Sequence, residues 1–375
     1  MGSRFRFSLR SFLIVTAVFG CLAGWITKER RQSRLEREFA AQMNGRGSVW
    51  FTDSYLWRER NDRRTPYWVR TATRNVLGER IWRLDMIASS DEDLAPVAQF
   101  TSLRDLRVTG RKIRSLIPLS GLHRLRRLNL EGGPIVDVSP LAGLIELHEL
   151  RLTDTMINDI TPLAGLKKLS TLDLARSPIR DITPLADLKN LAELDLRATQ
   201  VRDVGPLAGA NRLRSLTLDD SPVSDLSPLA GLINLDGLWL RNTPVRDVSP
   251  LAGMSNLRSL ALDYSQVRDL GPIAKLTQLE SLAIIGTPVV DISPLSDLEK
   301  LTRLRMTETK VNDLTPLKTL QALAEIHIDP RVIGEMSNLD GLLKLRFVYI
   351  TRGATDEQIL RLRRALPEGI TISQW

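Results

Sequence analysis

The strongest constraint on this chain is a repeat of 22 residues that runs through most of its length. Prolines recur at this interval in successive rows, with no insertion or deletion between them. They stand at Pro96, Pro118, Pro140, Pro162, Pro184, Pro206, Pro228, Pro250, Pro272, Pro294 and Pro316. Because proline makes up only about 5% of average sequence, composition alone does not produce this lattice. Repeats of this length predict a solenoid, in which each unit packs only against its neighbours.

The first half of each row predicts a short strand. Leucines in the pattern L-x-x-L-x-L, such as Leu147, Leu150 and Leu152, alternate with polar residues, so one face of the strand is buried. Three residues later comes a Ser or Thr, such as Thr155, whose hydroxyl can satisfy the backbone where the strand turns away. The Ile or Val that follows, such as Ile157, is expected to point back into the core.

The second half of each row, S/T-P-L-A-G-L, predicts one helical turn on the opposite side. We expect the Ser or Thr to be the N-cap and the proline to occupy the first helical position, where its missing N–H costs nothing. An aspartate precedes this turn in nearly every row and is expected to accept hydrogen bonds from nearby N–H groups, with no metal or catalytic role. These residues are Asp93, Asp137, Asp159, Asp181, Asp203, Asp225, Asp247, Asp269, Asp291 and Asp313.

The repeat lattice extends over fourteen strand positions, from about residue 84 to about residue 370. Atypical ends are expected to act as caps: a helix over 66–78 at one end, and a helix over 356–366 with a Thr355/Gln358 capping box at the other. The predicted organisation is a basic tail (1–10), an apolar segment (11–27), a charged juxtamembrane helix (28–45), an N-terminal cap region (46–80), the repeats (81–353) and a C-terminal cap helix and strand (354–375).

The apolar segment Ser11–Thr27 carries no charge and is flanked by arginines and lysine. Its 17 residues would form a helix about 26 Å long, at the short end of what spans a membrane. The first interpretation is a retained single-pass anchor, with the solenoid outside the cytoplasm. A cleaved signal peptide and a lipoprotein signal ending at Cys21 are the alternatives.

Charged residues are unevenly distributed along the chain. Residues 1–83 carry 17 Lys and Arg against 7 Asp and Glu, whereas the rest is slightly acidic. An anionic membrane surface is therefore the expected partner of the basic end, and nucleic acid is not an expected partner of the repeats. The lone Cys21 excludes an intramolecular disulfide.

The row L-x-x-L-x-L-x-x-T-x-I/V-x-D-I/V-S/T-P-L-A-G-L resembles the 22-residue leucine-rich repeat of internalins over roughly residues 81–330. The resemblance implies an α/β solenoid: a right-handed, curved leucine-rich repeat with a concave parallel β-sheet, convex 3₁₀ turns and partners bound on the concave face. Both ends of the chain resemble planctomycete single-pass proteins of unassigned function. We expect neither the immunoglobulin-like module nor the cell-wall sorting signal of internalins, so host-cell adhesion does not carry over.

The sequence gives no sign of an enzyme. His123, His148 and His327 lie in separate rows, and no H-E-x-x-H, G-x-S-x-G, C-x-x-C or phosphate-binding glycine loop occurs. No catalytic residue, metal or cofactor is expected. The predicted function is a monomeric protein-interaction module for a protein ligand of unknown identity. A purely structural envelope scaffold and a regulatory subunit of an enzyme complex are the alternatives.

The predicted binding patch centres on Trp239, which occupies an outward strand position among small residues of the adjacent rows. Tryptophan and arginine are enriched at the centres of protein interfaces. Packing of the indole over its small neighbours, purely for stability, is the alternative. The other residues assigned to this patch are Arg197, Asp219, Arg241, Asp263, Tyr264 and Ile285.

Overall fold

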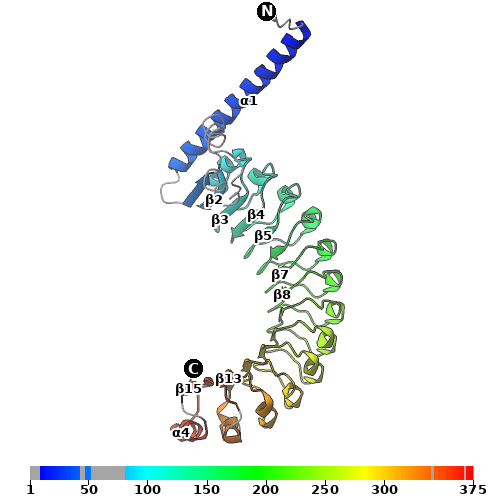
Figure 1. Cartoon of the computed structure of the whole chain (residues 1–375), viewed down its shortest axis with the longest axis vertical. Helices are drawn as coiled ribbons and strands as arrows, with labels where there is room; N and C mark the ends of the chain where they lie inside the picture. Colours follow the sequence, from blue (N-terminus) through cyan, green and yellow to red (C-terminus); the bar gives the residue numbers. More distant parts are fainter. Residues whose placement is uncertain (1–8, 43–46, 52–80, 339–341, 367–368, 375) are drawn as a thin grey trace, which may run out of the picture.

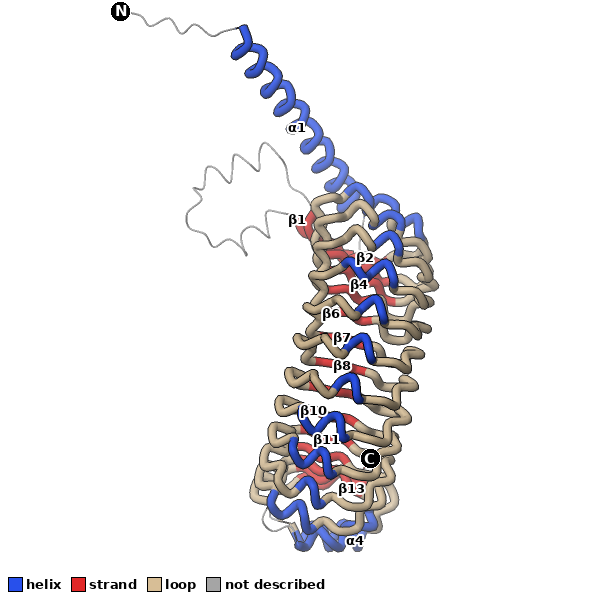
Figure 2. The backbone as a smooth tube through the Cα atoms, turned by 90° about the vertical axis from the view of Figure 1, so that its right-hand side faces the viewer, coloured by secondary structure: helices blue, strands red, loops and turns tan. Residues whose placement is uncertain are grey.

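The protein is a curved solenoid with a helix projecting from its N-terminal end (Figure 1). The structure is a computed structural model that describes residues 9–42, 47–51, 81–338, 342–366 and 369–374. One sheet contains all the strands in sequence order, and 3₁₀ turns line the opposite, convex side (Figures 1 and 2). Strands β2 to β15 pair in parallel, which confirms the predicted fold class and the fourteen predicted strand positions.

The strands are β1 (Gly47–Phe51), β2 (Ile81–Ile87), β3 (Asp105–Thr109), β4 (Arg127–Glu131), β5 (Glu149–Arg151), β6 (Thr171–Asp173), β7 (Glu193–Asp195), β8 (Ser215–Thr217), β9 (Gly237–Trp239), β10 (Ser259–Ala261), β11 (Ser281–Ala283), β12 (Arg303–Arg305), β13 (Glu325–Ile328), β14 (Phe347–Ile350) and β15 (Thr371–Gln374). The α-helices are α1 (Leu9–Gln42) and α4 (Asp356–Ala365). Between the strands lie 3₁₀ turns, from Asp91–Asp93 to the longer Pro330–Asn338.

The repeated leucines form one continuous core. Leu150 pairs with Leu172 of the next strand, and Leu172 with Leu194, so equivalent side chains stack at every step. All three are essentially inaccessible to solvent. The Ser/Thr column behaves as predicted: the buried Thr199 hydroxyl donates to the carbonyl of Leu196 at 2.6 Å. The hydroxyl thus supplies a hydrogen-bond donor to a backbone carbonyl that lies just past the end of the short strand.

The convex turns are capped by aspartate, which corrects the predicted role of the Ser/Thr residues. The turn Ser139–Leu141 begins at Ser139, so this residue is the first of the turn and not its N-cap. The Asp137 carboxylate accepts from the Ser139 backbone N–H at 2.8 Å and from its hydroxyl at 2.9 Å. The same backbone bond recurs at Asp159, Asp181, Asp203, Asp225, Asp247, Asp269, Asp291 and Asp313. Asp93 departs from the pattern and accepts from the Ser89 N–H instead.

Each of the nine repeats from Gly132 to Glu308 leaves its strand through a residue with left-handed backbone, a feature that we did not predict from the sequence. Two of these residues are glycine, Gly132 and Gly286; the other seven have φ between 52° and 60°, a conformation that is uncommon for residues other than glycine. These seven are Asp154, Arg176, Ala198, Asp220, Asn242, Tyr264 and Glu308. Most of their N–H groups extend the inter-strand ladder, as where the Asp154 N–H donates to the Ala175 carbonyl at 2.9 Å, whereas the Glu308 N–H donates to the Asp329 carboxylate. This hydrogen bond offsets part of the backbone strain.

The N-terminal helix α1 runs without a break through the predicted boundary at residues 27 and 28. Its last turns cover the first repeat: the buried Glu36 accepts from the Ile81 backbone N–H at 2.5 Å, and the Phe39 ring packs edge-on against Phe100 with centroids 4.9 Å apart. The helix predicted for this covering role, 66–78, lies outside the described residues. Strand β1 then pairs antiparallel with β2.

The predicted membrane segment Ser11–Thr27 forms part of α1, but the side chains of residues 9–23 lie outside the description. Within the part of the chain that the structure describes, none of the helices has the combined length and apolarity that crossing a membrane requires. The membrane anchor stays a prediction.

The C-terminal end is closed as the sequence predicted. The Thr355 hydroxyl accepts from the Gln358 N–H at 3.2 Å, and the Gln358 side chain accepts from the Thr355 N–H at 2.8 Å, which completes the capping box of α4. Leu362 of α4 is fully buried, so the helix shields the last repeats from solvent.

Candidate functional site: the concave face

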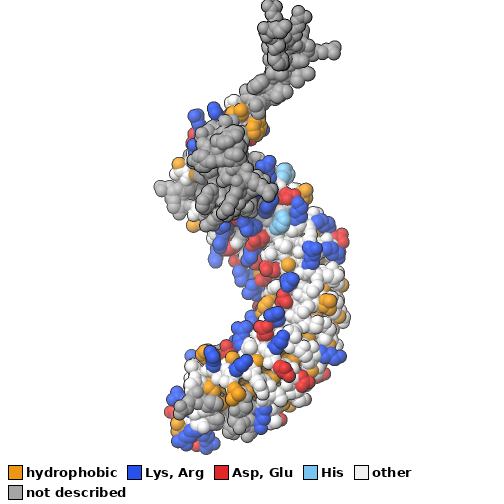
Figure 3. All heavy atoms as spheres, in the orientation of Figure 1, with side chains coloured by type: hydrophobic (Ala, Val, Ile, Leu, Met, Phe, Trp, Pro, Cys, Tyr) orange, Lys and Arg blue, Asp and Glu red, His pale blue; other side chains and the backbone are white. Residues whose placement is uncertain are grey.

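The outward side chains of the concave sheet fall into three zones along the solenoid. Each strand has two outward residues in its central part. From β2 to β7 at least one of them is charged, from β8 to β11 both are neutral and mostly small, and from β12 to β14 they are charged or aromatic. Figure 3 shows positive and negative side chains intermixed along the inner edge beside the N-terminal strands. The neutral zone consists of Ser215, Thr217, Gly237, Trp239, Ser259, Ala261, Ser281 and Ala283.

Most charges of the zone from β2 to β7 form ion pairs within the zone. The Arg127 guanidinium lies 3.1 Å from the Asp105 carboxylate on the preceding strand, and Arg151 lies 2.8 Å from Glu149 on its own strand. Burial raises the pKa of Asp105, an effect that the charges of Arg127 and Arg83 oppose. Among the described residues, Asp173 and Glu193 of β6 and β7 have no cation within ion-pair distance, whereas the other charges at these positions are paired and so offer little unmet electrostatic attraction to a ligand.

In the neutral zone the indole of Trp239 lies flat along its own strand. An added Cβ at Gly237 would meet the indole Cη2 at 2.3 Å, so the ring occupies the space that a side chain at Gly237 would need. Trp239 is half-buried in this position. Beside it, Ala261 and Ala283 are 3% and 5% exposed, so the floor of the zone is recessed below its taller neighbours.

One side of the neutral zone is held by Arg241 between two buried aspartates. Its guanidinium is 3.1 Å from Asp263 and 3.6 Å from Asp219, in the repeats to either side. Asp219 also accepts from the Arg241 backbone N–H at 2.8 Å, and Asp263 accepts from the Ile285 N–H at 2.9 Å. Burial raises the pKa of Asp219, whereas the hydrogen bond and the charge of Arg241 oppose that rise. These contacts therefore join three consecutive repeats and stabilise their packing.

The remaining predicted patch residues lie at the periphery. Arg197 forms its ion pair with Asp195 of its own repeat at 2.7 Å. Tyr264 is 53% exposed, and its ring covers Gly286 of the next repeat, where an added Cβ would lie 2.4 Å from the ring. Ile285 is buried. The structure therefore gathers Trp239, Asp219, Arg241, Asp263 and Ile285, with Tyr264 and Arg197 at the edges.

Sequence reasoning missed a group of side chains at the C-terminal end of the same face. The His327 and Tyr349 rings stack with centroids 4.5 Å apart, and Phe347 lies 6.3 Å from Tyr349 while 40% exposed. Burial lowers the pKa of His327, which contacts Glu325 at 2.7 Å. The signal was present in the sequence, since three aromatic or imidazole rings occupy outward positions of two adjacent strands. On the same face, Arg305 of β12 is half-buried.

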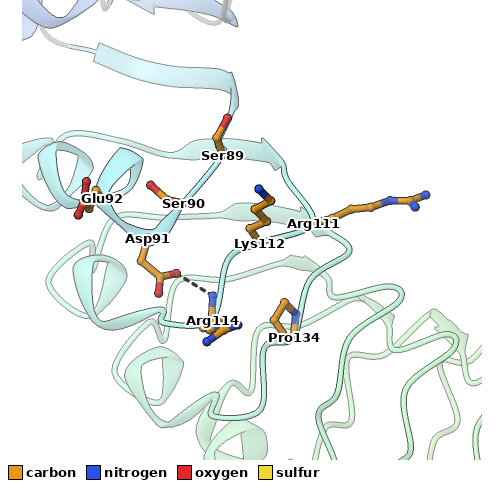
Figure 4. Close-up of a pocket in the computed structure, with 8 residues that line it drawn as sticks. All are labelled: Ser89, Ser90, Asp91, Glu92, Arg111, Lys112, Arg114 and Pro134. Atoms are coloured by element: carbon orange, nitrogen blue, oxygen red, sulfur yellow. Dashed lines mark hydrogen bonds between the residues drawn. The ribbon is translucent and has the colours of Figure 1, made fainter.

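A hollow of about 420 Å³ lies near the N-terminal end of the solenoid (Figure 4). It is lined by Ser89, Ser90, Asp91, Glu92, Arg111, Lys112, Arg114 and Pro134. Asp91 accepts from the Arg114 N–H at 2.7 Å and from the Ser115 N–H at 3.1 Å, so it acts as a backbone cap. The basic side chains around the hollow are exposed. Among the described residues there is no cluster of three His, Cys, Asp or Glu suited to a metal ion.

Comparison with known proteins places this architecture among leucine-rich repeat structures. An internalin (InlF) from Listeria monocytogenes matches with a TM-score of 0.69 and 28% identity over 78% of this chain and 86% of that one. A leucine-rich repeat protein of Leptospira interrogans matches with a TM-score of 0.62 and 17% identity over 78% of this chain and 89% of that one. The plant peptide hormone receptor RGFR1, solved in complex with RGF2, matches with a TM-score of 0.53 and 15% identity over 74% of this chain and 52% of that one.

No model of a protein family matches the sequence, and no curated protein matches it. The assignment therefore comes from the repeat and from the fold. The parallel strands in 22-residue register and the convex 3₁₀ turns of this chain form a fold that matches the solved internalin over most of both chains. The chain is a leucine-rich repeat protein built on the internalin-type 22-residue repeat.

Proposed function

We propose that this protein is a non-enzymatic interaction module that binds a protein ligand on its concave face, centred on Trp239. The observation that carries this proposal is the break in the charge pattern: charged side chains, most of them ion-paired, line β2 to β7, whereas β8 to β11 present an indole, two alanines and small hydroxyl residues. An apolar surface next to polar rims is typical of interface centres. Solved leucine-rich repeat structures with bound peptide, such as RGFR1 with RGF2, support the choice of ligand class.

The proposal includes attachment to a membrane through Ser11–Thr27, with the solenoid outside the cytoplasm and the protein monomeric. The uncharged sequence and its flanking basic residues support the anchor. Sodium carbonate extraction and protease protection of the full chain in spheroplasts test it. Retention in the membrane with digestion before lysis is expected. Full release by carbonate would remove the anchor from the proposal, and digestion only after lysis would reverse the orientation.

Photocrosslinking tests the ligand site directly in cells. A benzophenone amino acid at Ser259, on the concave face beside Trp239, is expected to trap a protein partner, whereas the same probe at the exposed edge residue Arg202 is not. Trp239→Ala should abolish the Ser259 product while the melting temperature changes little, because interface hot spots cost about 2 kcal/mol or more of binding when truncated. Equal products at both positions, or a Ser259 product indifferent to Trp239→Ala, would contradict the proposed site.

A further inference from the structure

On the concave face two small residues separate Trp239 from Arg305, and we call this stretch the recess because the alanines are buried whereas Trp239 and Arg305 are only half-buried. Both residues occupy the same outward position on their strands, and the register places Ala261 and Ala283 between them, in the order Trp239, Ala261, Ala283, Arg305. Three strand spacings separate the two walls by about 14 Å. The floor is two buried methyl groups with Ser259 and Ser281 alongside. The recess thus has an aromatic wall at one end and a cationic wall at the other.

Arg305 differs from the other arginines of the concave sheet. Arg83, Arg107, Arg127, Arg151, Arg197 and Arg241 each form an ion pair with an aspartate or glutamate on the same face. Among the described residues, neither Arg305 nor its neighbour Arg303 has a carboxylate within ion-pair distance. The Nε of Arg305 is buried and has no hydrogen-bond partner. A buried donor that lacks an acceptor is unfavourable, but this Nε is itself inaccessible, so a ligand carboxylate would pair with the remainder of the half-buried guanidinium.

We infer that this recess binds an extended segment of a partner protein in which an acidic side chain pairs with Arg305 and an apolar side chain packs against Trp239. The inference rests on the proposed concave-face function and specifies its ligand. An extended chain advances about 3.3 Å per residue, so about four residues separate the two anchors. The small residues between the walls leave room for the backbone of the segment.

The charge around Arg305 favours a single carboxylate over a polyanion. Arg303, Arg305 and Arg331 lie in the same repeats as Glu308, Glu325 and Asp329, so their formal charges balance. A nucleic acid or an acidic polysaccharide gains affinity by neutralising many charges at once, and here it would meet as many carboxylates as guanidinium groups. One carboxylate at Arg305 avoids that repulsion.

Selection from a random dodecapeptide phage library on the full chain tests the inference. Enriched peptides should contain Asp or Glu about four residues from an apolar or aromatic residue. For the best synthetic peptide, Arg305→Gln should weaken binding by roughly tenfold to a hundredfold, the range for a charged hydrogen bond. Replacing the acidic residue of the peptide by its amide should have the same effect on the wild-type protein, and the two changes together should lose no more than either alone.

Arg151→Gln is the matched control, because Arg151 occupies the equivalent strand position on β5 and is paired with Glu149; it should leave peptide binding unchanged. The peptide amide substitution keeps the test valid even if Arg305→Gln impairs folding. Binding that is lost in Trp239→Ala but indifferent to Arg305→Gln would overturn the inference while leaving the proposed function intact. Peptides indifferent to both variants, or no enrichment over bare support, would contradict the proposed function itself. Tighter, Arg305-dependent binding of heparin or a 20-nucleotide thymidine oligomer would assign the recess to a polyanion and overturn the inference.

Discussion

The indole of Trp239 lies directly over Gly237, two residues earlier on the same strand, in the space that a side chain would fill. The equivalent position is serine on the two adjacent strands, at Ser215 and Ser259, and on β11, at Ser281. The glycine therefore sets the orientation of the indole and with it the depth of the recess.

Gly237→Ser is expected to push the ring off the strand and weaken binding of the selected peptide by at least several-fold. The fold should survive, since serine is tolerated at this position in three neighbouring repeats. Fluorescence anisotropy gives the affinity and scanning calorimetry the melting temperature. The reverse change next door, Ser259→Gly, is the control and should keep the affinity close to wild type. Unchanged affinity in Gly237→Ser would show that the ring position does not matter for binding.

Arg241→Ala is expected to destabilise the protein by about 1–2 kcal/mol, since it leaves two buried aspartates without their cation while the arginine itself is partly solvated. Without Arg241 the pKa of Asp219, already raised by burial, rises further. When the pKa of a carboxyl is higher in the folded state than in the unfolded state, the free energy of unfolding increases as the pH falls through that pKa. The deficit of the variant should therefore narrow between pH 7 and pH 5, as measured by thermal unfolding.

The control for this prediction is Arg214→Ala. Arg214 pairs with Asp236 at 3.3 Å, but both side chains are well exposed, so its loss should cost well under about 1 kcal/mol at either pH. An Arg241→Ala deficit that is constant with pH would mean that lost packing of the arginine stem, and not its charge, is responsible.

The capping aspartates predict acid sensitivity. Hydrogen bonds from the backbone N–H and hydroxyl two residues later lower the pKa of Asp137, Asp159, Asp181, Asp225, Asp247, Asp291 and Asp313. Their stabilisation is complete above the unfolded-state pKa, about 3.9, and is lost as the pH falls through the lower folded-state values. The buried Asp105 and Asp219 and the half-buried Asp173, whose pKa is raised by desolvation, act in the opposite direction.

The triple variant Asp159→Asn, Asp181→Asn, Asp225→Asn keeps an acceptor oxygen for each turn but cannot titrate. Its melting temperature should fall less than that of the wild type between pH 6 and pH 2.5. Asp187→Asn, at an exposed position outside the capping column, should follow the wild-type curve. Parallel curves for the triple variant and the wild type would show that the caps do not govern acid unfolding.

Phe39→Ala is expected to loosen the N-terminal repeats selectively. The lost contact with Phe100 exposes the first repeat, and because each repeat contacts only its neighbours the effect should fade along the solenoid. Hydrogen exchange should accelerate clearly in β2 and β3 and remain unchanged in β10 to β12. Ile145→Ala, which removes an exposed aliphatic side chain, should alter neither region. Faster exchange along the whole sheet would mean that the solenoid opens as one unit.

Much of the fold was predictable because every repeat carries the same local sequence pattern for its strand and its turn. Leucine alternation identified the strands, and Thr355 with Gln358 identified the last helix, because both signals act within a few residues. Five of the nine left-handed positions carry Gly, Asp or Asn, the types that adopt this conformation most readily, but Arg176, Ala198, Tyr264 and Glu308 break that pattern, so the column escaped prediction. At those four positions hydrogen bonds to the next repeat, and not residue preference, hold the backbone in this conformation.

The candidate site was predictable only in part. The outward position of Trp239 followed from the period of the strand, but the direction of its ring depends on Gly237 and on packing. Likewise the sequence alone cannot distinguish Arg305 from Arg151, since both follow a leucine on a strand. Whether a carboxylate lies within reach depends on neighbours 22 residues away and on their rotamers. The missing partner of Arg305 therefore became visible only in three dimensions.

The uninterrupted α1 also has a mechanical consequence. At 1.5 Å per residue its 34 residues form a rod of about 51 Å, and the last turns of that rod are wedged against Phe100 and Ile81. Tension on a ligand held in the recess would travel through the stacked leucines of the repeats to the contacts of Phe39 with Phe100 and of Glu36 with Ile81. The helix and the solenoid would turn together, so the direction in which the recess opens is fixed by how the far end of the rod is held.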